Sequence, residues 1–371
     1  MLKVAIVGCG KIADEHAAQI GRIPDCDIVA ACDREPLMVR QLAERFPVKR
    51  CFTDLAELLT ESRPDVVHIT TPPQSHFSLA RQCLEFGCHV YVEKPFTVTA
   101  TETHQLITLA DKLNLKLTAG HDCQFRAGAE RMRALIATGY LGGMPVHMEG
   151  HYCYEIGRDA YSGALLGDKS HWVRQLPGKL LHNIISHGIA TIAEYMDDNP
   201  KVIVHGYTSP LLKSLGEVEI VDELRVIISA NEQMTAFFTF SSQLRPCLHQ
   251  FRIYGPKNGI ILDHDHETVI KLHGLRYKSY AEKFIPPVNF AKQYLDNLAA
   301  NVCIFMKNDF HMKAGMKHLI ERFYLSIINN IPVPIPYREI LLTATIMDDI
   351  FTQLNAIRNT HSDRVVASSL I

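Results

Sequence analysis

Residues 1–120 alternate between short apolar runs and helical patterns, and this alternation restricts the fold more than any other feature of the chain. The apolar runs have the length and β-branched content of buried parallel strands; they are Lys3–Val7, Ile28–Cys32, Val66–Thr70, Val90–Val92 and Lys116–Thr118. The helical patterns between them are Ile12–Ile20, Leu37–Phe46, Leu55–Thr60, His76–Phe86 and Glu102–Leu113. This β-α-β-α order predicts a doubly wound parallel sheet with right-handed crossovers. We expect Thr53 to cap the start of the third helix and Gly87 the end of the fourth.

The pattern changes after about residue 122, where strand-like runs follow one another without helices between them. That succession predicts an open, mostly antiparallel sheet in a second, α+β domain. The runs are Val146–Tyr154, Leu224–Ala230, Thr235–Ser241, His249–Tyr254 and Gly259–Leu262. From Asn289 to Leu354 the period is helical, with a proline-rich break at 331–336. The expected domains are therefore 1–121 and 122–371.

Composition narrows the class of protein without identifying it. Of the 371 residues, 47% are apolar and 21% charged, and the net charge of −2 gives no argument for a nucleic-acid or membrane partner. The ten cysteines are scattered, with no Cys-x-x-Cys pair, as expected in a reducing compartment. A strand begins near Leu2, which leaves no room for a signal peptide, so we expect a cytoplasmic protein.

A Gly-x-Gly-x-x-Ala run at residues 8–13 follows the first strand and opens the first helix. This is the context that a dinucleotide-binding loop requires. The first glycine permits a tight turn, and the second lets the backbone approach a pyrophosphate. Free amides at the helix N-terminus then face the phosphates. The residues expected to hold a cofactor here are Gly8, Gly10, Lys11 and Ile12.

The second strand ends at Asp33, about 20 residues further on, where a carboxylate can bind a ribose 2′-hydroxyl. A 2′-phosphate would be repelled by Asp33, although Arg34 could soften that repulsion. The sequence therefore favours NAD as cofactor and makes NADP the less favoured alternative.

Two further strand ends carry polar residues. The fourth helix is preceded by a proline-rich loop in which Thr71, Pro72 and His76 are candidate cofactor contacts. A well-formed strand-to-helix turn would explain most of this loop, so for His76 a structural role is an equal alternative. The next strand runs into Glu93-Lys94-Pro95, a charged pair followed by a proline at the edge where ligands bind.

These three features, in this order, resemble the Gfo/Idh/MocA family, named after glucose–fructose oxidoreductase, inositol dehydrogenase and rhizopine catabolism. The resemblance implies an NAD(P)-dependent oxidoreductase with a cofactor domain at 1–121 and a substrate-binding and oligomerisation domain at 122–371. It also implies that Glu93 and Lys94 lie at the cofactor, that Lys94 projects at the nicotinamide–substrate junction, and that the Lys94–Pro95 bond is cis.

The run from Leu180 to Ile189 is expected to form a helix on which Asn183 and His187 share one face. By resemblance, His187 matches the family's catalytic histidine. Asn183 stands where the family usually has an aspartate, and an amide cannot act as a base. Lys94 and His187 are then the expected proton carriers, with Asn183 holding a substrate hydroxyl. No metal site is expected, because the spacing of His182 and His187 fits helical ligands poorly.

Three other residues are candidate substrate contacts, each with a structural alternative. His121 follows the strand-like run Lys116–Thr118, Tyr154 ends a strand-like run, and Trp172 is the only tryptophan. The expected reaction is hydride transfer between the nicotinamide and a secondary alcohol of a sugar, sugar derivative or cyclitol. Two alternatives remain open: an NAD-recycling enzyme that cleaves glycosides, and a non-catalytic NAD(P) sensor. By resemblance, the strands at 224–262 suit a homodimer or homotetramer.

Overall fold

The structure is a computed structural model that describes residues 1–156, 166–231 and 233–368. The chain divides into two compact units. The first contains Met1–Phe125 and Met312–Ala344, and the second contains Arg126–His311 and Thr345–Ile371. A segment from late in the sequence thus belongs to the N-terminal unit.

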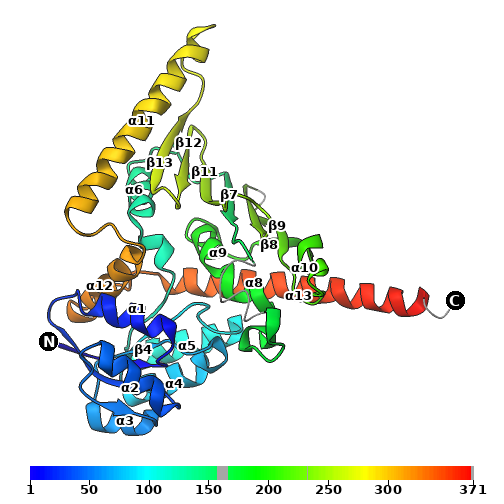
Figure 1. The fold of residues 1–371 in the computed structure, drawn as a ribbon. Helices are drawn as coiled ribbons and strands as arrows, with labels where there is room; N and C mark the ends of the chain where they lie inside the picture. Colours follow the sequence, from blue (N-terminus) through cyan, green and yellow to red (C-terminus); the bar gives the residue numbers. More distant parts are fainter. Residues whose placement is uncertain (157–165, 232, 369–371) are drawn as a thin grey trace. The chain divides into compact units, whose positions relative to one another are not determined.

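The first unit is built on a six-stranded parallel sheet in the order β3-β2-β1-β4-β5-β6. Figure 1 labels β4 of this sheet and the helices α1 to α5. This is the strand order of a dinucleotide-binding Rossmann fold, so the predicted doubly wound sheet is confirmed. The two-residue strand β3 was not predicted. The strands are β1 Leu2–Val7, β2 Cys26–Cys32, β3 Cys51–Phe52, β4 Val66–Ile69, β5 His89–Val92 and β6 Leu117–Ala119.

Five helices follow the strands of this sheet, close to their predicted positions. They are α1 Lys11–Ile20, α2 Pro36–Arg45, α3 Leu55–Ser62, α4 His76–Phe86 and α5 Ala100–Leu113. Gly87 ends α4 at a φ of 100°, which confirms the predicted cap. The predicted cap at Thr53 is wrong, because the Asp54 carboxylate accepts the hydrogen bond from Glu57 N instead.

Helix α12 (Ala314–Ile328) completes the core of the first unit. Its side chains Leu319 and Phe323 are fully buried in the hydrophobic core that also contains the strand residues of this sheet. The segment after it also binds the edge strand, since Leu117 N of β6 donates to Tyr337 Oη at 3.2 Å. This contact satisfies an edge-strand amide that would otherwise lack a strand partner.

The second unit contains a seven-stranded sheet in the order β13-β12-β11-β7-β10-β9-β8. Among the strand pairs that the structure describes in this sheet, only β7–β10 is parallel, which confirms the predicted mostly antiparallel sheet. Strands β8 and β13 were not predicted, and the run predicted to reach Tyr154 ends two residues earlier. The strands are β7 His147–Tyr152, β8 Lys201–Tyr207, β9 Glu223–Ala230, β10 Met234–Ser241, β11 His249–Tyr254, β12 Asn258–Asp263 and β13 Thr268–His273.

The helices of the second unit are α6 Ala127–Ala137, α8 Lys179–Ile184, α9 Ser186–Ala193, α10 Pro210–Ser214 and α11 Ala281–Met306. The last helix, α13 Tyr337–Ser368, begins in the first unit and continues in the second. Helix α9 packs closely on the sheet at Gly188. A Cβ there would lie 2.4 Å from Phe238 Cε2, so only glycine permits this approach. The predicted single helix from Leu180 to Ile189 is wrong, because it is interrupted at Ile185, whose ψ is −13°.

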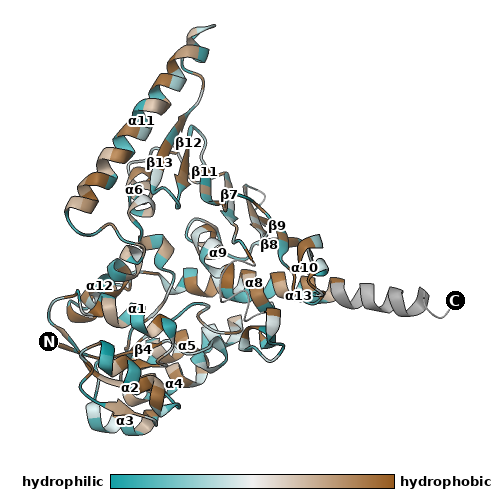
Figure 2. Cartoon of the chain, viewed as in Figure 1, coloured by the Kyte–Doolittle hydropathy of each residue, from teal (hydrophilic) through white to brown (hydrophobic). Residues whose placement is uncertain are grey.

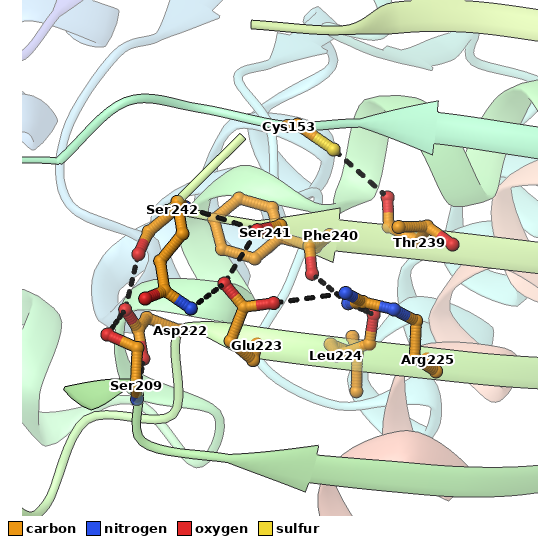
Figure 3. Close-up of polar contacts among 11 residues, drawn as sticks. Cys153, Ser209, Asp222, Glu223, Leu224, Arg225, Thr239, Phe240, Ser241 and Ser242 are labelled. Atoms are coloured by element: carbon orange, nitrogen blue, oxygen red, sulfur yellow. Dashed lines mark hydrogen bonds and ion pairs between the residues drawn. The ribbon is translucent and has the colours of Figure 1, made fainter. Parts of the chain in front are cut away.

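A buried acidic cluster joins the ends of β8, β9 and β10 (Figure 3). Asp222 accepts hydrogen bonds from Ser209 N and Oγ at 2.6 and 2.7 Å and from the Ser242 hydroxyl. Its neighbour Glu223 accepts from Ser241 Oγ at 2.6 Å and from Arg225. These carboxylates are occupied by local donors, so the cluster holds strands together.

Among the described residues, one helical stretch is long and apolar enough to cross a membrane by length and composition: Tyr337–Ile357 in α13. Of its most apolar window, 44% is buried inside the fold. Core helices of soluble proteins pass the same test, so this stretch is weak evidence for a membrane span.

Candidate functional site

The glycine loop of the first unit has the geometry of a phosphate cradle. Gly8 has a φ of 92°, and a Cβ there would lie 2.6 Å from Thr71 Cγ2 and 2.8 Å from Thr71 N. At Gly10 a Cβ would meet nothing within 4 Å. The first glycine is therefore required by the fold itself, whereas the second leaves open space above the start of α1. These residues fit a dinucleotide, whose pyrophosphate needs such an opening.

Asp33 lies at the end of β2 and is tied directly to this loop. Its Oδ2 accepts a hydrogen bond from Cys9 N at 2.6 Å, and its Oδ1 accepts one from Glu35 N at 2.9 Å. A carboxylate has about four acceptor sites, so two remain for the hydroxyls of a ribose. Arg34 follows on the exposed side of the turn.

His76 at the start of α4 holds two strand-end loops together. Its Nε2 lies 2.8 Å from Thr71 O, and its Nδ1 lies 3.0 Å from Pro95 O and 3.2 Å from Phe96 O. Burial lowers the pKa of this ring, although the three carbonyls oppose that effect. Because both ring nitrogens face backbone carbonyls, His76 acts on the site by fixing the loop after Lys94. Direct cofactor contact by Thr71, Pro72 or His76 stays a prediction.

Glu93, Lys94 and Pro95 follow β5 at the same edge of the sheet. The Lys94–Pro95 peptide bond is cis, as the resemblance implied. Glu93 is 5% exposed, and its Oε2 accepts a hydrogen bond from Lys94 N at 3.1 Å. Gly120 at the end of β6 allows this packing, because a Cβ there would lie 2.9 Å from Glu93 Oε1.

A row of buried hydrogen bonds leads from Glu93 through the core of the first unit. Glu93 Oε1 lies 2.9 Å from His16 Nε2, and His16 Nδ1 lies 2.8 Å from His68 Nδ1. His68 Nε2 lies 2.8 Å from Tyr324 Oη on α12. Tyr91 stacks on His68, with ring centroids 4.7 Å apart and planes 7° apart. The row therefore connects a strand-end carboxylate with a helix from late in the sequence.

One arrangement of protons satisfies every member of this row. Tyr324 donates its hydroxyl proton to His68 Nε2, and His68 donates from Nδ1 to His16 Nδ1. His16 then donates from Nε2 to the Glu93 carboxylate. Burial raises the pKa of Glu93, but the hydrogen bond from His16, together with Lys94, outweighs burial and holds this pKa below its ordinary value. The carboxylate is therefore ionised beside Lys94.

His121 follows β6 and is 2% exposed, within electrostatic reach of Glu93 and Lys94. Burial lowers its pKa to about 4, a shift that Glu93 opposes and Lys94 reinforces. Thus the first unit brings together three predicted site residues, Glu93, Lys94 and His121, at the ends of β5 and β6.

In the second unit, Asn183 lies on α8 and His187 in the first turn of α9. His187 is 9% exposed, and its ring lies beside that of Tyr152, with centroids 5.7 Å apart. Ile185 separates the two helices, so Asn183 and His187 do not lie on one continuous helix. The pairing of Asn183 with His187 on one face therefore stays a prediction.

The remaining substrate candidates of the second unit are half-buried. Tyr154 lies beyond the end of β7, and Trp172 begins a 3₁₀ turn, with its ring stacked on His171 at 5.6 Å. Lys179, which has a φ of 47°, forms an ion pair with Glu219 at 2.6 Å. The substrate roles of Tyr154 and Trp172 stay predictions.

Sequence reasoning missed His16 and His68, although both carried a signal. His68 interrupts an otherwise apolar strand, and His16 shares the inner face of α1 with Ala13 and Ile20. A polar residue at a position that the pattern buries needs a buried partner. Glu93 is such a partner, 77 residues away from His16.

Comparison with known proteins relates the chain to dehydrogenases. The chain is 32% identical over 142 residues to D-glucoside 3-dehydrogenase of Escherichia coli, an alignment that covers 38% of this chain and 40% of that protein. It is 20% identical over 330 residues to myo-inositol 2-dehydrogenase of Thermotoga maritima, covering 83% of this chain and 88% of that protein. The aligned part of the chain thus spans less than half the length of the D-glucoside 3-dehydrogenase.

Solved structures share the fold at low sequence identity. One is the WlbA dehydrogenase of Bordetella pertussis in complex with NADH and UDP-GlcNAcA, with a TM-score of 0.72, 16% identity and coverage of 95% of this chain and 94% of that one. Another is UDP-N-acetylglucosamine 3-dehydrogenase GnnA of Acidithiobacillus ferrooxidans, with a TM-score of 0.69, 18% identity and coverage of 95% and 98%. Residues 2–121 match the model described as oxidoreductase family, NAD-binding Rossmann fold, which confirms the predicted type of cofactor domain. This match is to the Gfo/Idh/MocA oxidoreductases, the family that residues 2–121 resemble.

Proposed function

We propose that this protein is an NAD-dependent dehydrogenase that oxidises a secondary alcohol of a sugar, sugar derivative or cyclitol. One observation carries the proposal: three features lie at the carboxyl ends of the strands of the first sheet. They are the open space at Gly10, the carboxylate of Asp33 after β2, and the Glu93-Lys94 pair after β5. The names of two relatives, D-glucoside 3-dehydrogenase and myo-inositol 2-dehydrogenase, support the substrate class.

NAD is the proposed cofactor, and NADP the less favoured one. The Asp33 carboxylate retains acceptor sites for ribose hydroxyls while holding Cys9 N and Glu35 N. A 2′-phosphate would bring two more negative charges to that carboxylate, with only the exposed Arg34 beside it to compensate. The dissociation constant for NAD should therefore be below that for NADP.

When bound, NAD supplies the hydride acceptor, and the protein supplies position and proton transfer. Lys94 Nζ and the His187 imidazole are the proposed proton carriers: one takes the hydroxyl proton while the other polarises the substrate oxygen. Asn183 is proposed to hold a substrate hydroxyl through its amide, since it cannot act as a base. His121, Tyr154 and Trp172 are proposed to contact the substrate.

Assembly into a homodimer or homotetramer through the open sheet is also proposed. Ile203, Ile227 and Phe237 are exposed and lie in register across β8, β9 and β10. Such an apolar row on a sheet face suits pairing with a second copy. We propose a cytoplasmic location on the basis of composition and cysteine usage.

A screen of sugars, amino sugars, nucleotide-sugars and inositols tests the proposed reaction by the absorbance of free NADH. Substrate-dependent release of NADH supports a dehydrogenase. Cleavage of a glycoside without released NADH would instead identify an NAD-recycling enzyme. Binding of NAD without any turnover across the screen would favour a non-catalytic sensor. The reason to consider this alternative is that Asn183 stands where the resembling family usually has an aspartate.

A further inference from the structure

Helix α11 packs on the sheet of the second unit through polar amides. Asn297 exchanges hydrogen bonds with the backbone of Val269, at 2.9 Å to its N and 3.0 Å to its O. One turn earlier, Gln293 does the same with Lys271, at 2.7 and 3.2 Å. These amides occupy the free backbone edge of β13, beside which α11 runs (Figure 1). The orientation of the helix is therefore set by its polar face.

The opposite face of α11 carries apolar residues, and the helix is coloured brown over several stretches in Figure 2. Large side chains on it are exposed by about half or more, including Leu295 at 66% and Leu298 at 60%. Turning the helix to bury this face would break the amide contacts with β13. The apolar face recurs at alternating spacings of three and four, at Val288, Ala291, Leu295, Leu298, Val302 and Phe305.

We propose that this row, the α11 seam, pairs with the α11 seam of a second copy of the chain as a short coiled coil. A repeat of 3.5 residues is the pattern that keeps a narrow apolar stripe facing a partner helix. A membrane-surface helix would instead carry many basic residues on its polar face. In α11 the only basic residues are Lys283 and Lys292, and the polar face already binds β13.

The exposed area is sufficient for a specific pair. The five large seam side chains and their exposed neighbours Tyr294 and Met306 offer roughly 600 Å² per copy, on the scale of buried aromatic and aliphatic groups. A pair would then bury about 1,200 Å², at the lower end of stable protein–protein interfaces. Self-pairing of one patch also gives a closed, two-fold assembly. This contact is separate from the sheet face and from the proposed dehydrogenase reaction.

Light scattering coupled to size exclusion tests the seam on the full-length protein. The double variant Leu295→Glu/Leu298→Glu should have half the molar mass of the wild type, whether the wild type is a dimer or a larger assembly that also uses the sheet. The matched control is Leu215→Glu, since Leu215 is 59% exposed but lies outside α11. The control should keep the wild-type mass, and all three proteins should bind NAD.

A milder variant separates the loss of the interface from misfolding that the two glutamates could cause. Leu295→Ala/Leu298→Ala removes only largely exposed atoms, and it should raise the dissociation constant of the assembly at least about tenfold. An unchanged molar mass and dissociation constant in both seam variants would overturn the proposal. It would equally be overturned if the wild type is monomeric but sediments with phosphatidylcholine–phosphatidylglycerol vesicles and the seam variants do not.

Discussion

His16 Nε2 lies 2.9 Å from Glu93 Oε1, and both side chains are buried in the core of the first unit. This contact fixes the carboxylate whose other oxygen accepts the amide of Lys94. Through His68 the same row reaches Tyr324 on α12, 256 residues away in the sequence from His68. The position of the Glu93-Lys94 loop therefore depends on residues buried in the core of the first unit.

Replacing His16 by alanine should destabilise the protein by about 3 kcal/mol, because it leaves a buried carboxylate and His68 Nδ1 without their partner. Urea denaturation followed by circular dichroism measures the change. The control is His104→Ala on the exposed side of α5, which should stay within about 0.5 kcal/mol of the wild type. Equal effects of the two substitutions would contradict a structural role for the buried row.

The two glycines of the cofactor loop should respond differently to alanine. Gly8→Ala places a Cβ 2.8 Å from Thr71 N at a φ of 92°, so it should lower the melting temperature markedly. Gly10→Ala meets open space and should leave stability within about 0.5 kcal/mol of the wild type. It should nevertheless weaken NAD binding at least about tenfold, because the methyl group occupies the approach to the pyrophosphate. Calorimetric titration with NAD checks this, and unchanged affinity would contradict the cradle.

Much of the fold follows from local sequence. Buried strands such as β1 and β4 are continuous apolar runs, and the Gly8–Ala13 loop has a signature that depends on neighbouring residues only. Edge strands are harder to recognise: β8 alternates between exposed and half-buried residues over most of its length, and β13 receives part of its hydrogen bonding from α11. Neither carries the apolar run that marks a central strand.

The parts of the site that escaped prediction depend on distant contacts. His16 and His68 are 52 residues apart, so no local pattern pairs them. The placement of α12 in the first unit depends on packing across the chain, which periodicity does not encode. The interruption at Ile185 occurs within an apolar helical pattern that carries no proline to mark it.

Stability should decrease as the pH falls below about 6.5. Burial lowers the pKa of His121 to about 4 and that of His264 to about 3, and it also lowers the pKa values of His68 and His76. The unfolded chain therefore binds more protons than the folded one in this range, and each ring contributes up to about 1.4 kcal/mol of lost stability per pH unit.

The loss of stability can be measured as a decrease in the urea concentration at the midpoint of unfolding between pH 7 and pH 5. His264→Leu should flatten the slope, because it removes one ring with a lowered pKa. His266→Leu, two residues away with a side chain that is 76% exposed, should leave the slope as in the wild type. Stability that is constant across this range would contradict the assignment of buried neutral histidines.

Asn183→Asp should change the pH dependence of turnover. A carboxylate four residues before His187 would favour the protonated imidazole and raise its pKa, which should move the acid limb of kcat/KM upward by about one pH unit. Asn289→Asp on α11 adds the same charge at an exposed position and should leave the profile unchanged. Identical profiles in the wild type and Asn183→Asp would mean that Asn183 does not influence the proton path.

The proposed role of Lys94 is tested most directly by the turnover of Lys94→Met with the best substrate of the screen. Positioned acid–base groups contribute about 10²- to 10⁴-fold in rate. The variant should therefore lose at least about 10²-fold in kcat, while the dissociation constant for NAD changes by less than about threefold because the Gly8–Ala13 loop and Asp33 are intact. Wild-type turnover in Lys94→Met would contradict the account.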